Sequence, residues 1–188
     1  MIAIIGMGTR GTLGLFLEPM SSSLSWSRET YALAMAIQNL LWGILLPFAG
    51  ALTDRYGASW VISAGAVFYA LGLWGMSTAD SVLMLHISGG ILMGLGSAFV
   101  AFNLAIAAMV KVVGPERRLL VMGVGTAATS TGQLIFSPMA QGMISSFGWS
   151  DALVYLSFIS LLMISFAVLL PSNPEVRGEA ATGQSISE

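Results

Sequence analysis

Long apolar runs, separated by short breaks with polar, Gly or Pro residues, dominate this 188-residue chain. A helix rising about 1.5 Å per residue needs about 17 to 25 apolar residues to cross a hydrocarbon core about 30 Å thick. Six runs qualify, at residues 1–17, 31–52, 59–78, 82–110, 119–144 and 152–170. The pattern predicts an all-α, polytopic membrane unit with six transmembrane helices over residues 1–171. Residues 172–188 are expected to form a flexible cytosolic tail or the start of a central loop.

The composition agrees with a membrane location. Hydrophobic residues make up 56% of the chain and charged residues 9%, and the mean hydropathy is +0.85, whereas soluble domains carry about a quarter charged residues. Cysteine is absent and histidine occurs once, which excludes thiolate zinc sites and cysteine–histidine catalytic pairs. With no basic patch and a net charge of -2, the chain is not expected to bind nucleic acid. We expect neither a metal site nor a cofactor.

Positive charges gather in alternate breaks between the runs. Arg55 follows the second run, Lys111, Arg117 and Arg118 follow the fourth, and Arg177 follows the sixth. Cytoplasmic loops accumulate Lys and Arg, so both termini are predicted to be cytoplasmic. The expected location is a multi-pass position in the plasma (inner) membrane.

An internal repeat links two parts of the chain. The segment Pro47–Gly57 aligns without a gap with Pro138–Gly148, which lies 91 residues later, and proline, alanine, glycine and an aromatic residue coincide. Three predicted helices separate the copies, and an odd number places them on opposite membrane faces. This predicts the inverted 3+3 repeat of secondary transporters. The alternative is a chance match, because Pro and Gly are common in membrane helices.

Two segments have small residues four positions apart, Gly90–Gly94 and Ala128–Gly132. Small residues at this spacing allow helix backbones to approach closely. We expect both segments to serve helix packing.

The segment Gly50-Ala-Leu-Thr-Asp-Arg-Tyr-Gly57, between the second and third runs, resembles the motif G-x-L-x-D-R-x-G of the major facilitator superfamily. Members of that family have twelve helices in two halves, so the resemblance covers nearly the whole chain and implies that a C-terminal half is missing. It also implies that Asp54 caps a helix of the other half and that Arg55 joins a cytoplasmic charge network, together favouring the outward-facing state. The gating motif is thus assigned to Gly50, Asp54, Arg55 and Gly57. The basic residue that often follows the motif is absent, because Ala58 stands there.

Three further segments resemble the monocarboxylate and oxalate/formate antiporter branch of this family, namely Gly14–Met20, Ser25–Arg28 and Glu116–Gly123. The acidic residue that animal monocarboxylate carriers place before a glycine in their first helix has no counterpart here. The substrates of those carriers are therefore not carried over to this chain.

Arg10 is the main candidate for solute binding. It lies about ten residues, or roughly 15 Å, before the predicted outer end of its helix, near the bilayer midplane, where an arginine costs about 2.5–3.5 kcal/mol to insert. A guanidinium binds a carboxylate in a bidentate fork, and transporter sites gather near the midplane, so an organic anion is the expected ligand. The alternative is a structural arginine paired with helix carbonyls.

Amide side chains inside the predicted helices form a second group of candidates, Gln38, Asn39, Asn103 and Gln133. They can orient a polar solute or hydrogen-bond between helices. The predicted substrate site consists of Arg10 with Asn103, Gln38 and Gln133.

Two patterns of enzymes are discounted. The segment Gly6–Gly11 matches G-x-G-x-x-G, but the dinucleotide fingerprint needs a soluble strand–helix–strand unit. Ser97 and His86 share one predicted helix about 16 Å apart, which is too far for a catalytic pair.

These features together predict a secondary active transporter that moves a small organic solute by alternating access. The expected solute is an organic anion such as a monocarboxylate, with a coupling ion. The chain is expected to be a fragment that works in the lipid bilayer with its missing C-terminal half or with a second copy. A half-sized homodimeric carrier and a non-transporting membrane scaffold are the alternatives, whereas an intramembrane enzyme is disfavoured.

Overall fold

The computed structural model describes the chain except residues 102, 105, 107–108, 110–114 and 171–188. Its elements are α1 (Ile2–Thr12), η1 (Leu13–Phe16), α2 (Leu17–Leu24), α3 (Arg28–Tyr56), α4 (Ala58–Ser77), α5 (Val82–Leu85), η2 (His86–Leu92), α6 (Met93–Phe99), η3 (Pro115–Arg117), α8 (Arg118–Phe147) and α9 (Trp149–Val168). Every regular element within these described ranges is helical. The all-α prediction is therefore confirmed.

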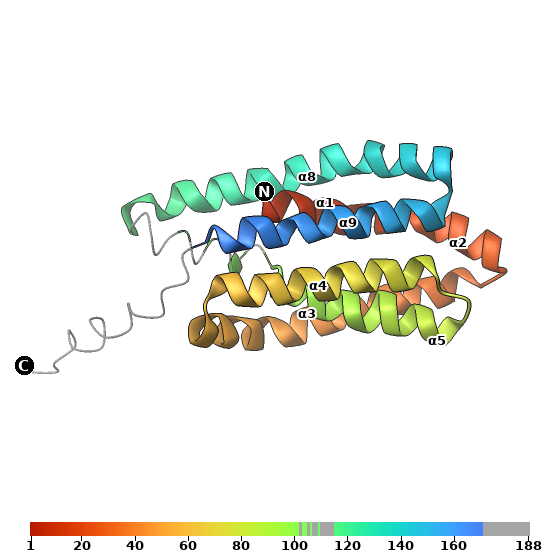
Figure 1. Cartoon of the computed structure of the whole chain (residues 1–188), viewed down its shortest axis with the longest axis horizontal. Coiled ribbons are helices and arrows are strands. Elements are labelled where there is room, and N and C mark those ends of the chain that lie inside the picture. The colour runs from red at the N-terminus through yellow and green to blue at the C-terminus, as the bar shows by residue number, and fades with distance from the viewer. Residues whose placement is uncertain (102, 105, 107–108, 110–114, 171–188) are drawn as a thin grey trace, which may run out of the picture.

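Five helices in the described part of the chain are long and apolar enough to cross a membrane: α3, α4, the continuous run Val82–Phe99, α8 and α9. The remaining apolar run, which is the first along the chain, consists of the consecutive elements α1, η1 and α2. Two groups of helices run side by side (Figure 1): α1 packs with α8 and α9, while α3 and α4 pack with η2 and α6, and contacts between α4 and α9 join the groups. The first helix of each three-helix copy thus packs among the last two helices of the other copy. This exchange is consistent with an inverted repeat.

The two junctions of the repeat have the same backbone geometry. Gly57 has φ 88° and ψ 151°, and Gly148, 91 residues later, has φ 86° and ψ 167°. Each of these glycines donates its N–H to the carbonyl four residues earlier, at 2.9 and 3.0 Å. Positive φ favours glycine, because a Cβ would clash with the backbone. Pro47 and Pro138 lie inside α3 and α8, each nine residues before the helix ends, so the alignment seen in the sequence is a structural repeat.

The first helix of each copy is irregular. In the first copy, the 3-10 segment η1 interrupts the helix, and the hydroxyl of buried Tyr31 donates to the Leu13 carbonyl at 2.6 Å. In the second copy, the π-helical segment η2 occupies His86–Leu92. Irregular backbone at membrane depth is tolerated only where protein or a cavity satisfies its polar groups. Both irregular segments lie in helices that pack between neighbours, where such partners exist.

Two of the predicted boundaries differ more from the structure than the others do. The first helical run continues to Leu24, because Pro19 falls in the first turn of α2, where proline is tolerated. The fourth helix was expected to run unbroken to residue 110, but it is interrupted after Phe99: Val100 and Ala101 are not helical, and the described residues Asn103, Leu104, Ile106 and Met109 are helical again. Val100 is wedged between two glycines: a Cβ on Gly6 or Gly65 would lie 3.2 or 2.9 Å from its side chain.

Several predicted segments fall partly or wholly outside the described residues. These segments are part of the run from 102 to 110, part of the break that contains Lys111, and the whole tail 172–188.

Glycines allow the closest helix contacts, as their spacing predicted. A Cβ on Gly90 would lie 3.0 Å from Ile37, and one on Gly94 would lie 2.8 Å from Leu41, so η2 and α6 approach α3 closely. A Cβ on Gly132 of α8 would lie only 2.3 Å from the carbonyl oxygen of Ile4 in α1. These contacts confirm that both small-residue segments serve helix packing.

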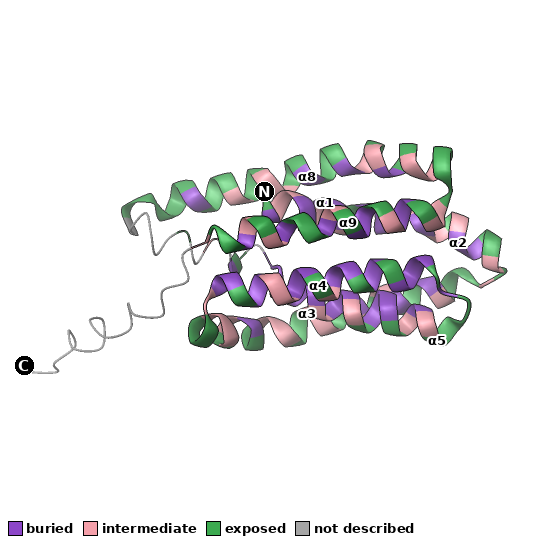
Figure 2. Cartoon of the chain, viewed as in Figure 1, coloured by how far each residue is buried: buried purple, intermediate pink, exposed green. Residues whose placement is uncertain are grey.

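Burial is uneven among the helices, as Figure 2 shows. Half of the most apolar window of α4 is buried, against 17% in α3 and in α8. Large apolar side chains on these two helices are exposed, including Leu40 at 63% and Leu134 at 76%. Apolar surface of this extent needs lipid or further protein to cover it.

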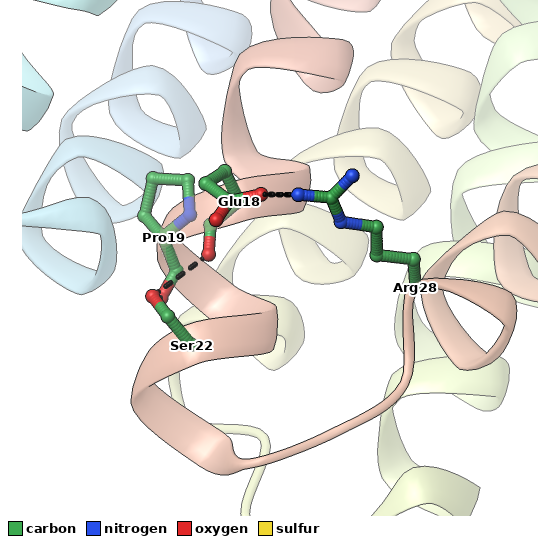
Figure 3. A network of polar contacts seen from close by, with 4 residues as sticks. All are labelled: Glu18, Pro19, Ser22 and Arg28. Carbon is green, nitrogen blue, oxygen red and sulfur yellow. Dashed lines mark hydrogen bonds and ion pairs between the residues drawn. The ribbon is translucent and has the colours of Figure 1, made fainter.

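An ion pair joins α2 to the start of α3 across the short loop between them (Figure 3). Arg28 Nη2 donates to Glu18 Oε2 at 2.7 Å, and Ser22 Oγ donates to the Glu18 carbonyl at 2.8 Å. Both charged side chains are about 70% exposed (68% and 72%). Exposed pairs of this kind contribute about 0–1 kcal/mol, so this contact fixes the loop more than it stabilises the fold.

Candidate functional site

Arg10 lies in the last turn of α1 and is half-buried. Its Nη2 donates to Asn39 Oδ1 of α3, and its Cζ lies 4.0 Å from the centre of the Trp42 ring. Asn39 and Trp42 are three residues apart on α3 and therefore lie on one helix face. This face holds the guanidinium between an amide oxygen and an aromatic ring.

A cavity opens beside this arginine and offers about 270 Å³ to the centres of water molecules. Its walls come from α1, η1, α3 and α8, and the lining residues are Met7, Arg10, Gly11, Leu13, Gly14, Met35, Gln38, Asn39 and Gln133. Among the described residues, the lining contains one cation and no carboxylate. The cavity is therefore electropositive, with an apolar component from methionine and leucine.

Gln38 is the least satisfied polar group of this lining. The residue is 2% exposed, and its Nε2 has no hydrogen-bond partner within the described part of the chain. A buried donor without a partner costs about 1–3 kcal/mol. Arg10 and Gln38 thus both line one cavity, although the Gln38 Nε2 atom itself is buried and does not reach the open space.

Three of the four predicted substrate residues line this cavity: Arg10, Gln38 and Gln133. Gln133 borders α1 closely, since a Cβ on Gly11 would lie 2.9 Å from its Cγ. Asn103 lies beyond the break at Val100–Ala101, is exposed, and is not among the lining residues. The structure therefore separates it from the other three.

The sequence reasoning missed the contacts that hold Arg10. Trp42 follows Gln38 by four residues and Asn39 by three, so helical spacing would have placed all three side chains on one face. Tyr69, whose hydroxyl donates to the Gly6 carbonyl at 3.0 Å, comes from 63 residues further along. No local pattern announces such a long-range contact.

The residues of the gating motif lie where α3 ends and α4 begins. Asp54 and Arg55 are exposed, and Arg55 Cζ lies 5.2 Å from the centre of the Tyr56 ring. Gly57 has the positive φ of the junction, whereas a Cβ on Gly50 would meet nothing within 4 Å. The backbone conformation thus requires glycine at position 57, the end of the motif. At position 50, the start of the motif, the packing within this chain leaves room for a side chain.

Neither enzyme-like pattern gains support from the structure. The glycine-rich segment Gly6–Gly11 lies inside α1, so the strand that a dinucleotide fingerprint requires is not there. His86 Nε2 lies 3.2 Å from the Thr30 carbonyl oxygen, a contact between helices. Over the described residues, no group of three or more His, Asp or Glu side chains could hold a metal ion.

A family model described as Major Facilitator Superfamily matches residues 1–187. Among curated proteins, the chain is similar to Monocarboxylate transporter 11 of Mus musculus, with 29% identity over 166 residues that cover 88% of this chain and 37% of that protein. It is also similar to Monocarboxylate transporter 13 of Rattus norvegicus, with 30% identity over 66% of this chain and 28% of that protein. The uncharacterized MFS-type transporter YhjX of Escherichia coli (strain K12) shares 27% identity over 97% of this chain and 45% of its own length. The chain thus spans less than half of the length of each of these relatives, all of which are named as transporters rather than enzymes.

Proposed function

Because this chain belongs to the Major Facilitator Superfamily, we propose that it forms part of a secondary active transporter that works by alternating access. The repeat junctions at Gly57 and Gly148 and the exchanged first helices support this proposal, because inverted repeats supply the two related states of such carriers. The names of the relatives point the same way. A non-transporting scaffold would not require the electropositive cavity.

We propose that the solute is a small organic anion, most simply a monocarboxylate, bound in the cavity beside Arg10. Arg10 itself does not carry this proposal. A desolvated cation–π contact of about 2 kcal/mol and a charge-assisted hydrogen bond of about 1.5–3 kcal/mol are together enough to offset the insertion cost of about 2.5–3.5 kcal/mol. A purely structural arginine would therefore be stable with Trp42 and Asn39 as its partners.

The observation that carries the anion proposal is that Gln38, whose buried Nε2 has no partner among the described residues, lines the same cavity as Arg10. A structural arginine gives no reason for a second buried donor beside it. A rotation of the Gln38 side chain would turn this amide towards the cavity, where a carboxylate could accept from it and from the guanidinium at once. Met7, Leu13 and Met35 in the lining would contact an apolar portion of the solute.

Uptake into proteoliposomes that contain the full-length protein tests this proposal. We expect a radiolabelled monocarboxylate to accumulate with wild-type protein, and its neutral amide analogue to compete poorly. Arg10→Gln removes the positive charge, while Arg28→Gln removes one from the α2–α3 loop and is the matched control. Equal uptake by wild type, Arg10→Gln and Arg28→Gln would contradict an anion site at Arg10.

We propose that Asp54 and Arg55 stabilise one closed state at the cytoplasmic face, as the motif implies in this family. Both side chains lie on the exposed surface at the end of α3, next to the junction with α4. Asp54→Asn should raise the inward-facing population, measured as faster thiol labelling of a single cysteine placed at Gln133 from the cytoplasmic side. This chain has no native cysteine, so only cysteines in the rest of the full-length protein have to be replaced before labelling. An unchanged labelling rate would remove the gating role.

The proposed partner is a second six-helix unit that covers the exposed faces of α3 and α8 in the bilayer. A missing C-terminal half fits the length of the relatives, which this chain covers by less than half. A second copy of this chain is the alternative. Reading the native transcript beyond the codon for Glu188 separates the two: six further helices support the first, and a stop codon supports the second.

Membrane placement and ion coupling complete the proposal. We propose cytoplasmic termini in a plasma (inner) membrane, because the described cations Arg55, Arg117 and Arg118 lie at helix ends on the side predicted to be cytoplasmic. A coupling ion would bind elsewhere in the protein, since the cavity lining holds no carboxylate.

A further inference from the structure

We propose that Asn39 is a positioning residue for Arg10: its amide oxygen holds the guanidinium at the cavity wall without cancelling the positive charge. This inference rests on the proposed function, because it assigns a role toward the solute of that same cavity. Asn39 is an exposed residue of α3 that lines the cavity together with Arg10 of α1. Its Oδ1 accepts a hydrogen bond from Arg10 Nη2, so one contact between two helices places the cation.

The orientation of the Asn39 amide is determined by its two neighbours. Its Nδ2 donates to the carbonyl of Met35, one turn earlier on α3, at 2.8 Å. A carbonyl only accepts hydrogen bonds and a guanidinium only donates them, so an amide turned the other way would lose both contacts. The Asn39 side chain therefore bridges the backbone of α3 to the guanidinium with its oxygen facing Arg10.

An amide oxygen accepts a hydrogen bond without adding charge. A carboxylate at position 39 would pair with the guanidinium through charge-assisted hydrogen bonds and would leave the site neutral. Over the described residues, the cavity lining contains no carboxylate, so the positive charge of Arg10 meets no counter-charge there. Asn39 thus fixes the guanidinium as an ion pair would and leaves its charge to a bound anion.

The contacts of Arg10 also leave donors for a solute. A guanidinium carries five N–H donors in one plane, and the bond to Asn39 uses one of those on Nη2. The Cζ atom lies over the Trp42 ring, 4.0 Å from its centre, which is a cation–π contact rather than a hydrogen bond. A pair of N–H groups therefore remains for a carboxylate that approaches the edge of the guanidinium.

A purely structural role of Asn39 gives a different expectation. If Asn39 only held α1 against α3, a carboxylate at this position would hold Arg10 at least as well, because charge-assisted hydrogen bonds are about twice as strong as neutral ones. If Asn39 keeps the charge of Arg10 available, the same carboxylate stabilises the protein but prevents anion binding. The nearly isosteric variant Asn39→Asp therefore separates the two roles.

Calorimetric titration of the purified full-length protein with propionate, a monocarboxylate, tests this inference. We expect Asn39→Asp to weaken propionate binding at least as much as Arg10→Gln does, while its thermal midpoint stays equal to or above that of wild type. Gln141→Glu is the matched control, because it makes the same amide-to-carboxylate change at an exposed residue of α8 that does not line the cavity. This control should bind propionate like wild type.

A second variant keeps the test independent of the added charge. Asn39→Leu is similar in size and removes the acceptor, so Arg10 keeps its charge and loses its fixed position. It should weaken propionate binding several-fold. The loss should vanish in the Arg10→Gln background, since residues that act through one another are not additive.

The outcomes distinguish this inference from the anion proposal itself. Wild-type binding by Asn39→Asp, with Arg10→Gln impaired, would overturn the positioning role and leave the anion site standing. Equal losses from Asn39→Leu in the wild-type and Arg10→Gln backgrounds would overturn it as well, because Asn39 would then act independently of Arg10. Wild-type binding by Arg10→Gln would overturn both proposals.

Discussion

The contact between α1 and α8 at Gly132 should be the least tolerant of a methyl group. Gly132 lies one residue before Gln133 of the cavity, and a Cβ there would meet the Ile4 carbonyl oxygen at 2.3 Å and the Ile4 Cα at 2.9 Å. Both atoms belong to backbone, so no side-chain rotation can relieve the overlap. Gly132→Ala therefore has to push the two helices apart.

The size of the effect follows from these distances. Carbon and oxygen that are not bonded approach to about 3.3 Å, so α8 has to shift by about 1 Å from its observed position, where the Cβ would be at 2.3 Å. A gap of about 0.5–1 Å forfeits a quarter to a half of each dispersion contact that it opens. Overpacking of this kind costs about 1–3 kcal/mol. Alanine in place of glycine also gains about 1 kcal/mol of helix propensity, which a control variant cancels.

Gly142→Ala is that control, because Gly142 lies on the same helix and a Cβ there meets nothing within 4 Å. The assay is the thermal midpoint of both variants in one detergent, followed by intrinsic tryptophan fluorescence. A difference of about 1–3 kcal/mol corresponds to roughly 2–12 °C for a chain of this size, with Gly132→Ala the lower. Equal midpoints would refute the close approach of α1 and α8.

Two further predictions follow from the cavity and from the repeat. Gln38→Leu should keep or raise the thermal midpoint, because it replaces an unpartnered buried amide. The same variant should weaken monocarboxylate binding about tenfold in competition assays. Unchanged affinity would exclude Gln38 from the site. Gly57→Ala and Gly148→Ala should each lower stability by about 1–2 kcal/mol through positive φ, measured as similar decreases in midpoint relative to Gly142→Ala. Loss at only one of the two junctions would contradict their equivalence.

Much of the architecture could be predicted from sequence because it depends on local patterns. The lengths of the apolar runs define the spans, and the match between Pro47–Gly57 and Pro138–Gly148 corresponds to two junctions with the same backbone angles. The break at Val100–Ala101 could not be predicted, because neither glycine nor proline marks it. It coincides with the contacts of Val100 with Gly6 and Gly65, which are distant in sequence.

For the candidate site too, the sequence predicted some residues and could not predict others. Arg10 was predicted as a site residue because a cation within an apolar run is unusual, and Gln38 and Gln133 were predicted because amides are rare there. Asn103 met the same criterion, but it follows the helix break at Val100–Ala101 and is not among the residues that line the cavity. Trp42, which contacts the guanidinium, and Tyr69, which donates to Gly6 of the same helix as Arg10, are ordinary aromatic residues of membrane helices, and only the folded structure shows that they lie near α1.

The most direct test of the account is the affinity of the purified full-length protein for a monocarboxylate, measured by isothermal titration calorimetry. Loss of a charge-assisted hydrogen bond costs about 1.5–3 kcal/mol, so Arg10→Gln should weaken binding by roughly 10- to 150-fold. Arg28→Gln, which removes a positive charge outside the cavity and outside the gating motif, should bind like wild type. If Arg10→Gln instead binds with wild-type affinity, Arg10 is a structural residue and the cavity does not select anions.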